Sequence, residues 1–211
     1  MMIQKIDFSD ALVDFSQNTP VERVNPHIND ALSFDLLPAL PYKLVQVLLA
    51  EPTVLIAEWK TGVSYAAGVH VYTQDLEAGM FRKKVWKALS TNASQPATGA
   101  AAWQYSDLLS FWEGFVKPYW VVSAYLRFIG VGNVFSTPSG LRSFNEAYSN
   151  NIDPATFGAF RRAFQTKADD YKARLLSELN RRKGSVNGVT YSSPAPDCNP
   201  APSSPIGFNV I

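Results

Sequence analysis

The sequence is short of several residue types on which particular functions depend. It holds a single cysteine among 211 residues, Cys198, so it can form neither an intrachain disulfide nor a metal site built from several cysteines. Its two histidines, His27 and His70, lie far apart in the sequence and belong to no partner motif. A phosphate loop, zinc-binding spacing, a serine elbow and a dinucleotide fingerprint are also missing. These absences argue against an enzyme, and we expect neither a cofactor nor a metal ion.

The chain also lacks a strong net charge and a long apolar run. Its net charge is +1, which does not indicate a nucleic-acid or membrane partner. The most apolar stretch, residues 118–134, is interrupted by Arg127 and is shorter before that residue than the roughly 20 residues needed to span a membrane. Lys5 and Asp7 stand where a signal peptide would carry its apolar run. We therefore expect intracellular folding and no membrane partner.

Helical periodicity dominates the first fifty residues. Thr19, Pro20 and Glu22 are typical of a capped helix start, and Pro26 should bend the first turns or move the start to Asn25. Two helices are predicted here, separated by residues 37–41. Their apolar stripes are Val24, Ile28, Ala31, Leu32 and Leu36, and then Leu44, Val45, Leu48 and Leu49.

The middle of the chain is ambiguous. Residues 54–59 fit either a short helix or a buried strand, whereas residues 69–72 favour an extended conformation. Thr73 is a candidate cap for a helix that runs to Leu89. The basic residues near the end of that helix could complement its dipole or contact DNA; they are Arg82, Lys83, Lys84 and Lys87.

A long aromatic helix and a turn follow. Apolar residues recur at spacings of three and four from Leu108 to Ile129, which predicts a buried helix with a kink at Pro118. The next segment carries turn residues that predict a short hairpin or a protruding loop, a candidate contact surface: Thr137, Pro138, Ser139 and Gly140.

The last helix has the clearest boundaries, with Asp153 as its cap, Pro154 at its first position and Gly184 at its end. Between Ala155 and Gly184, eight basic residues stand against three acidic ones. This basic face is either simply solvated or lies near DNA. The candidates for a DNA-facing surface are Arg161, Arg162, Arg181, Arg182 and Lys183.

The final segment, residues 185–211, is rich in proline and serine and ends on apolar residues. Prolines favour an extended segment, and the apolar end favours docking on another chain. Folding back on its own domain, or disorder, is the alternative. The expected contact residues are Ile206, Phe208, Val210 and Ile211. The sequence therefore predicts a mainly α-helical bundle (residues 19–184) with a hairpin or loop excursion, preceded by an N-terminal segment (1–18) and followed by an extended arm (185–211).

Two groups of short motifs resemble the head–tail connector (neck adaptor) proteins of tailed bacteriophages. The resemblance covers approximately residues 7–179 and depends on the order of the motifs. The first group consists of Asp7-Phe8, Phe15, residues 26–31 and residues 35–40. The second consists of residues 117–120, residues 124–128, residues 137–140, Asn145-Glu146 and a closing amphipathic helix with Tyr171.

The resemblance implies a structural virion protein, assembled in the host cytoplasm, that forms a ring of about twelve copies beneath the portal. Its partners would be other copies of the chain, the portal protein, tail or other neck proteins and, transiently and without sequence specificity, the packaged DNA. A tail-completion or other neck ring protein is the nearest alternative. An intracellular helical DNA-binding module that uses the basic last helix is the alternative from a different class.

Overall fold

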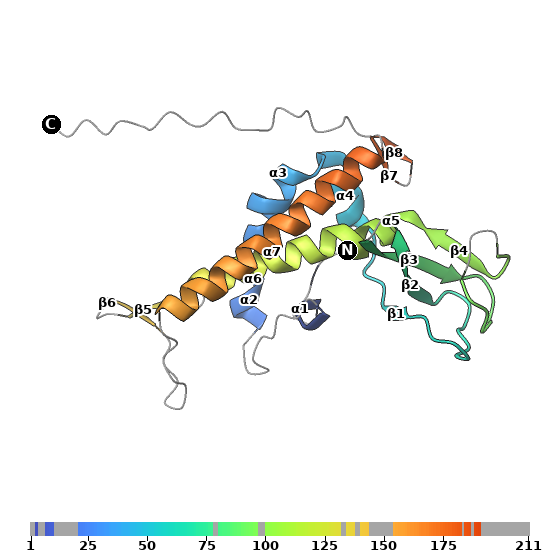
Figure 1. Ribbon diagram of the computed structural model, residues 1–211, viewed down its shortest axis with the longest axis horizontal. Coiled ribbons are helices and arrows are strands. Elements are labelled where there is room, and N and C mark those ends of the chain that lie inside the picture. Colours follow the sequence, from blue (N-terminus) through green and yellow to red (C-terminus); the bar gives the residue numbers. More distant parts are fainter. Residues whose placement is uncertain are drawn as a thin grey trace.

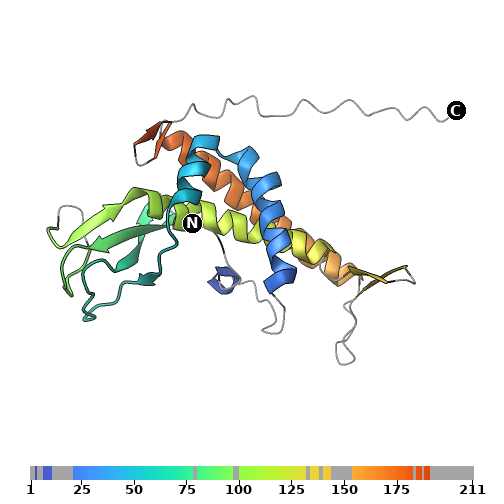
Figure 2. The ribbon, with the colours of Figure 1, turned by 180° about the vertical axis from the view of Figure 1, so that it is seen from behind.

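The computed structural model describes residue 3 and residues 7–10, 21–77, 80–96, 100–131, 134–137, 140–143, 154–182, 184–186 and 188–190. Helices and a sheet form two neighbouring parts (Figure 1). The long helices α6 (Lys117–Val131) and α7 (Pro154–Arg181) lie side by side, and α2 (Val21–Ala31) packs against α6. The sheet stands at one end of this helical layer and the hairpin of β5 (Val134–Thr137) and β6 (Gly140–Ser143) stands at the other, as the view from behind also shows (Figure 2).

The prediction of a mainly α-helical bundle is wrong, because the middle of the chain forms a four-stranded mixed sheet. Its strands, in spatial order, are β1 (Ile56–Glu58), β2 (His70–Glu77), β3 (Met80–Ala88) and β4 (Trp103–Ser106). β1 is parallel to β2, while the β2–β3 and β3–β4 pairs are antiparallel. The chain is a mixed α/β protein.

The helix predicted from Thr73 to Leu89 is instead the β2–β3 hairpin. Its register pairs Val71 with Trp86 and Tyr72 with Val85, so neighbouring residues face opposite sides of the sheet. The apolar residues of this segment lie four or five positions apart, which fits a helical stripe. Its β-branched and aromatic residues also suit a sheet that is buried on both faces. Burial on both faces, which is a tertiary property, therefore decided the conformation. The segment left open at residues 54–59 contributes β1, and the extended conformation predicted at residues 69–72 is confirmed.

Each face of the sheet packs against a different core. Val85 and the partly buried Tyr72 and Ile56 face the main core, which the helices complete. Residues on the other face form a smaller cluster with the loops before β2 and β4, where Tyr65 and Asn92 exchange backbone hydrogen bonds of 2.8 and 3.0 Å. This cluster contains Tyr65, Val71, Trp86, Ala88 and Trp103. The sheet thus lies between the helical layer and a layer of loops.

The predicted helices outside the sheet region are confirmed. α2 buries Val24, Ile28 and Ala31, and α4 (Tyr42–Ala50) buries Leu44, Val45 and Leu48. α2 is described from Val21 and contains Pro26 within it, while the predicted cap Thr19 and the predicted first residue Pro20 lie outside the described residues. In the N-terminal segment, Ile3 and Phe8 reach the main core, Phe8 from the short helix α1 (Asp7–Asp10). Ile3 and α1 therefore pack against the helical domain.

Two π-helical turns stand directly before proline-containing helix starts. η1 (Leu32–Leu36) precedes α3 (Leu37–Ala39), in which Pro38 is the second residue. η2 (Trp112–Val116) follows α5 (Asp107–Phe111) and precedes α6, in which Pro118 is the second residue. A proline ring crowds the carbonyl four residues earlier, and in both cases that residue lies inside the wider π turn. The aromatic helix therefore continues through Pro118, as predicted, and its irregularity precedes the proline.

The last helix ends where its glycine predicts. α7 stops at Arg181, and Gly184 adopts a φ of 82°. Two short strands, β7 (Ser185–Val186) and β8 (Val189–Thr190), then form an antiparallel pair at the start of the segment predicted as an arm. The cap residue Asp153 and the arm residues Ile206, Phe208, Val210 and Ile211 lie outside the described residues.

Substituting two glycines by alanine should have opposite effects. Gly184→Ala should destabilise the protein by about 1 kcal/mol, because a residue with a Cβ is strained at positive φ. Gly114→Ala should stabilise it by about 0.5 kcal/mol, because Gly114 is helical and a Cβ there would meet only the Lys83 carbonyl oxygen, at 3.9 Å. Urea unfolding of both variants tests this pair. If both substitutions changed the free energy of unfolding in the same direction, the positive φ of Gly184 or the helical conformation of Gly114 would be contradicted.

Candidate functional site

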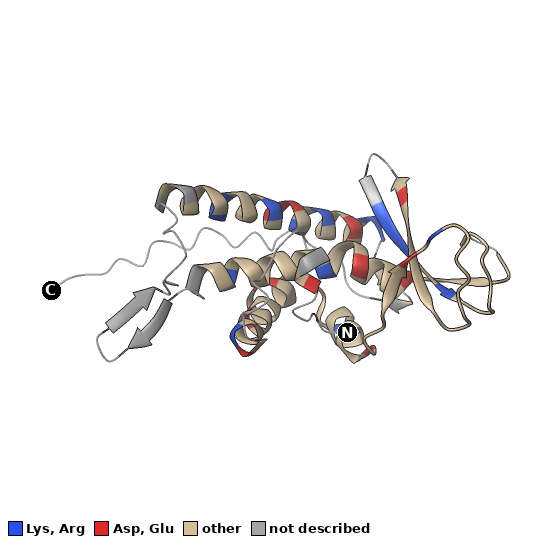
Figure 3. Cartoon of the chain, turned by 90° about the horizontal axis from the view of Figure 1, so that it is seen from below, with Lys and Arg blue, Asp and Glu red and all other residues tan. Residues whose placement is uncertain are grey.

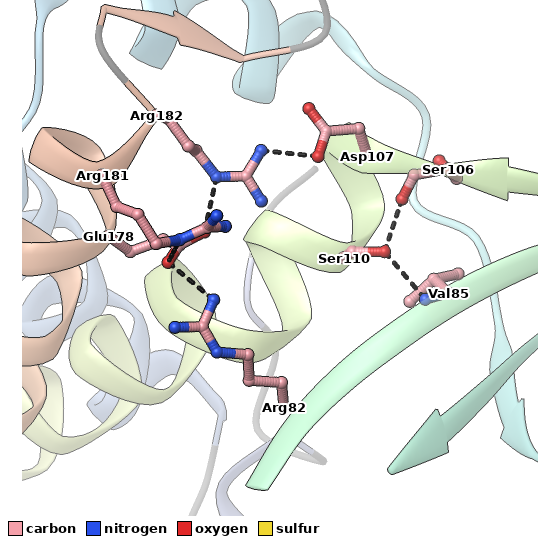
Figure 4. Close-up of polar contacts among 8 residues, drawn as sticks. All are labelled: Arg82, Val85, Ser106, Asp107, Ser110, Glu178, Arg181 and Arg182. Carbon is pink, nitrogen blue, oxygen red and sulfur yellow. Dashed lines mark hydrogen bonds and ion pairs between the residues drawn. The ribbon is translucent and has the colours of Figure 1, made fainter. Parts of the chain in front are cut away.

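The end of α7 is tied to the sheet through one buried carboxylate, Glu178. Its side chain is 2% exposed and accepts hydrogen bonds from three arginines (Figure 4). Arg82 of β3 donates from Nη1 to Oε2 at 2.9 Å, Arg181 donates to both oxygens at 2.8 and 2.6 Å, and Arg182 donates from Nε to Oε1 at 2.8 Å. Arg182 also donates from Nη1 to Asp107 at the start of α5. We call Arg82, Asp107, Glu178, Arg181 and Arg182 the Glu178 cluster.

Two members of the cluster are held as buried charges, and their pKa values reflect it. Burial by itself would raise the pKa of Glu178, but the hydrogen bonds from Arg181 and Arg182 and the charges of Arg182 and Arg82 outweigh burial and lower it. Burial opposes the charged form of Arg182 as well, yet the hydrogen bonds and charges of Asp107 and Glu178 raise its pKa. Both groups are therefore ionised at neutral pH.

A second polar contact joins the sheet to α5 beside the cluster. The backbone N–H of Val85 donates to the Ser110 hydroxyl at 2.8 Å, and that hydroxyl donates to the carbonyl of Ser106 at 2.6 Å (Figure 4). Ser106 is the last residue of β4, so this contact lies where the β3–β4 ladder gives way to α5. Together with the Glu178 cluster, it joins β3, α5 and α7 at one junction.

The five candidate DNA-facing residues divide into different environments. Arg181 is 58% exposed and Arg162 is exposed, whereas Arg182 is 11% exposed and engaged with Glu178 and Asp107. Arg161 lies near the other end of α7, in a cleft bordered by α2 and α6. Lys183 lies outside the described residues. The structure therefore brings Arg181 and Arg182 together and separates both from Arg161.

The exposed part of α7 is nevertheless mainly cationic, and Lys and Arg residues occur along the whole helix (Figure 3). Lys167, Arg174 and Arg181 follow one another at seven-residue spacing, which places them in one row. Lys167 and Arg174 each lie 6.0 Å from the ring centroid of Tyr171. The basic residues of β3 continue this surface toward the sheet: Arg82, Lys83 and Lys84.

The cleft between α2, α6 and α7 has a volume of about 500 Å³ and carries charges of both signs. Arg127 forms a two-pronged ion pair with Asp35, with both N–O distances at 2.8 Å. His27 lies edge-on to Phe128, and within the described part of the chain its buried Nδ1 has no hydrogen-bond partner. Burial lowers the pKa of His27, although the charge of Asp30 partly opposes this effect. The cleft is therefore a polar region between α2, α6 and α7.

Only two of the four residues predicted as a loop contact lie within the described part of the chain. Thr137 and Gly140 pair across the β5–β6 hairpin, which confirms a hairpin at this position, while Pro138 and Ser139 lie outside the described residues. Among the residues that the structure covers, no three histidine, cysteine, aspartate or glutamate side chains gather as a metal site would require. None of the described helices is both long enough and apolar enough to cross a membrane.

Sequence reasoning missed the central residues of the Glu178 cluster. In the sequence, Glu178 is only one of three acidic residues in a basic segment, and Arg82 belongs to a basic group predicted to complement a helix dipole or to contact DNA. These two residues are 96 positions apart, and Arg182 and Asp107 are 75 apart. No local pattern connects residues at such separations, so only the packing of α7 against β3 and α5 could reveal the cluster.

The fold and the cluster define a mixed α/β protein in which a helical layer is joined to a small sheet by buried arginine–carboxylate contacts. The chain belongs to the family of unknown function DUF6712, whose model matches residues 87–199. The matched segment starts in β3 and includes β4 and all elements from α5 to β8. No curated protein and no solved structure matches the chain.

Proposed function

We propose that this chain is a head–tail connector (neck adaptor) subunit of a tailed bacteriophage, forming a ring between the portal and the tail around the DNA channel. The observation that carries the proposal is the contact between the two groups of motifs that resemble that family. The indole N–H of Trp120 donates to the carbonyl of Ile28 at 2.9 Å, and Arg127 binds Asp35. Residues more than 90 positions apart thus form one packed unit.

Two surface features support the same proposal. Exposed apolar side chains on the α2–α4 region provide material for contacts with neighbouring subunits, since Phe34 is 65% exposed and Tyr42 is 68% exposed. The cationic row on α7 suits weak contact with sliding DNA, because phosphate contacts position a protein without reading sequence. In this proposal the protein is part of the virion and has no catalytic role.

Negative-stain microscopy of the purified protein, alone and with a portal protein, tests the proposal. We expect rings with rotational symmetry, at least when the portal protein is present. Deleting Ser203 to Ile211 should leave the helical domain folded, as judged by circular dichroism, and should reduce ring formation. The full-length protein at the same concentration is the control.

A featureless monomer in both conditions would overturn the proposal. If that monomer also bound DNA with steep salt dependence, the DNA-binding module would become the better assignment. Rings that bind a tail protein but do not bind the portal protein would favour the tail-completion alternative.

A further inference from the structure

The Glu178 cluster borders a hollow of about 280 Å³ between β3, the α5–η2 segment and the end of α7. Its lining has an excess of positive charge, because it contains one carboxylate, that of Glu178. The cationic residues in the lining are Arg82, Lys83, Lys84, Arg181 and Arg182, and Trp86, Tyr105 and Phe115 provide aromatic walls. By contrast, the cleft between α2, α6 and α7 has three aspartates, Asp30, Asp35 and Asp169, beside its cationic residues.

The guanidinium groups around this hollow are held in place before any ligand arrives. Arg182 is 11% exposed and lies 5.1 Å from the ring centroid of Phe111, and Arg82 is 14% exposed and lies 5.8 Å from that of Phe115. Glu178 forms ion pairs with both guanidinium groups, and its own side chain is 2% exposed. Groups that are already ordered lose little entropy when they bind a ligand, so an anion would meet a preorganised site.

If the Glu178 cluster served only to join α7 to the sheet, about one cation for each carboxylate would be enough. Here three arginines reach the same carboxylate, and Lys83 of β3 lines the same hollow. Two of the lining cations also have another carboxylate partner, since Lys84 pairs with Asp75 at 3.0 Å and Arg182 with Asp107. Like charges gathered at this density repel one another, and an anion among them relieves that repulsion. Arginine forks match the oxygens of phosphate in particular, since several donors can share its non-bridging oxygens.

We propose that this hollow is a binding site for a phosphate group. The phosphate can come from a nucleic-acid backbone or from a small free phosphate anion, since both present the same oxygens to the arginines. The proposal stands on the hollow alone and holds whether or not the chain forms a connector ring.

Isothermal titration calorimetry at constant ionic strength tests the site, with sodium pyrophosphate and a short oligodeoxynucleotide as separate probes. In the full-length protein, Arg181→Gln and Lys83→Gln should each raise the dissociation constant of any probe that binds the wild type by about tenfold or more. Each substitution removes a charged donor. Arg181 is the most exposed arginine of the cluster, so its replacement leaves Arg82 and Arg182 on Glu178. Arg23→Gln, on the exposed surface of α2, removes the same charge elsewhere and should change affinity less than about twofold.

Binding of both probes, with the expected loss in the two hollow variants, would support a small-anion site that also accepts a backbone phosphate. Binding of the oligodeoxynucleotide alone, with the same losses, would assign the phosphate to nucleic acid. The proposal is overturned if neither probe binds the wild type, or if Arg23→Gln weakens binding as much as Arg181→Gln does. Ring formation by the Arg181→Gln variant reports on the connector proposal separately.

Discussion

Replacing Glu178 with glutamine should reduce the free energy of unfolding by about 3–5 kcal/mol, which is typical when one partner is removed from a buried ion pair. The glutamine amide would turn a donor toward guanidinium groups that are themselves donors. Arg82 and Arg182, which are 14% and 11% exposed, would then lose their shared carboxylate. Urea unfolding at neutral pH measures the difference.

Asp170→Asn is the matched control for this change. Asp170 is exposed on the same helix, and its substitution removes the same charge, so we expect an effect within about 0.5 kcal/mol. If Glu178→Gln cost no more than Asp170→Asn, the Glu178 cluster would not be what joins α7 to the sheet.

The contribution of Glu178 should also depend on pH. Because the pKa of Glu178 is lowered in the folded protein, its stabilising effect is complete above the ordinary value of 4.5 and is lost as pH falls through the lowered value. The stability difference between the wild type and Glu178→Gln should therefore be constant from neutral pH down to about pH 5 and should shrink below about pH 4.5. A difference that grew with acidification would contradict the assigned ionisation.

Replacing Trp120 with phenylalanine should cost about 2–3 kcal/mol, because it removes a buried hydrogen bond and part of a buried ring. Trp120 is completely buried, its indole N–H donates to the Ile28 carbonyl at 2.9 Å, and its ring meets that of Trp112 edge-on. The change would remove this hydrogen bond between α2 and α6. Urea unfolding followed by circular dichroism measures the loss.

Trp59→Phe is the comparison at a partly buried tryptophan. Within the described residues, the buried Nε1 of Trp59 has no hydrogen-bond partner, so the same substitution there should cost about 1 kcal/mol or less. Equal costs at the two positions would show that the Trp120 hydrogen bond does not stabilise the contact between α2 and α6.

The elements that could be predicted are those with local signals. Pro154 at the first position and Gly184 beyond the last turn bound α7, since proline fits a helix start and glycine tolerates positive φ. The turn residues around Pro138 predicted the hairpin that pairs Thr137 with Gly140. Both signals act within a few residues, so they hold whatever the rest of the chain does.

The segment from Thr73 to Leu89 shows where such reasoning fails. Its apolar residues fit a helical stripe and a strand pattern alike. Of the two roles predicted for Arg82, Lys83 and Lys84, a helix dipole or a DNA contact, the first is wrong because no helix exists there. The helical core on one face and the loop layer on the other bury the end of the β2–β3 hairpin that holds Val71, Val85 and Trp86. That environment is supplied by residues distant in sequence, and it outweighs a weak local preference.

By itself, the sequence determined which segments outside the sheet are helical, where α7 begins and ends, the apolar stripes that α2 and α4 bury, and the cationic character of α7. Capping, helical periodicity and charge count are local properties of a chain. Only the tertiary structure decided that the middle segment forms a sheet and that Arg182 belongs to a buried cluster while Arg162 remains exposed. It also decided that Arg181 and Arg182, at the end of α7, line one hollow with three basic residues of β3. The reason is physical: burial and charge pairing depend on which surfaces meet, and here they join residues 75 to 96 positions apart.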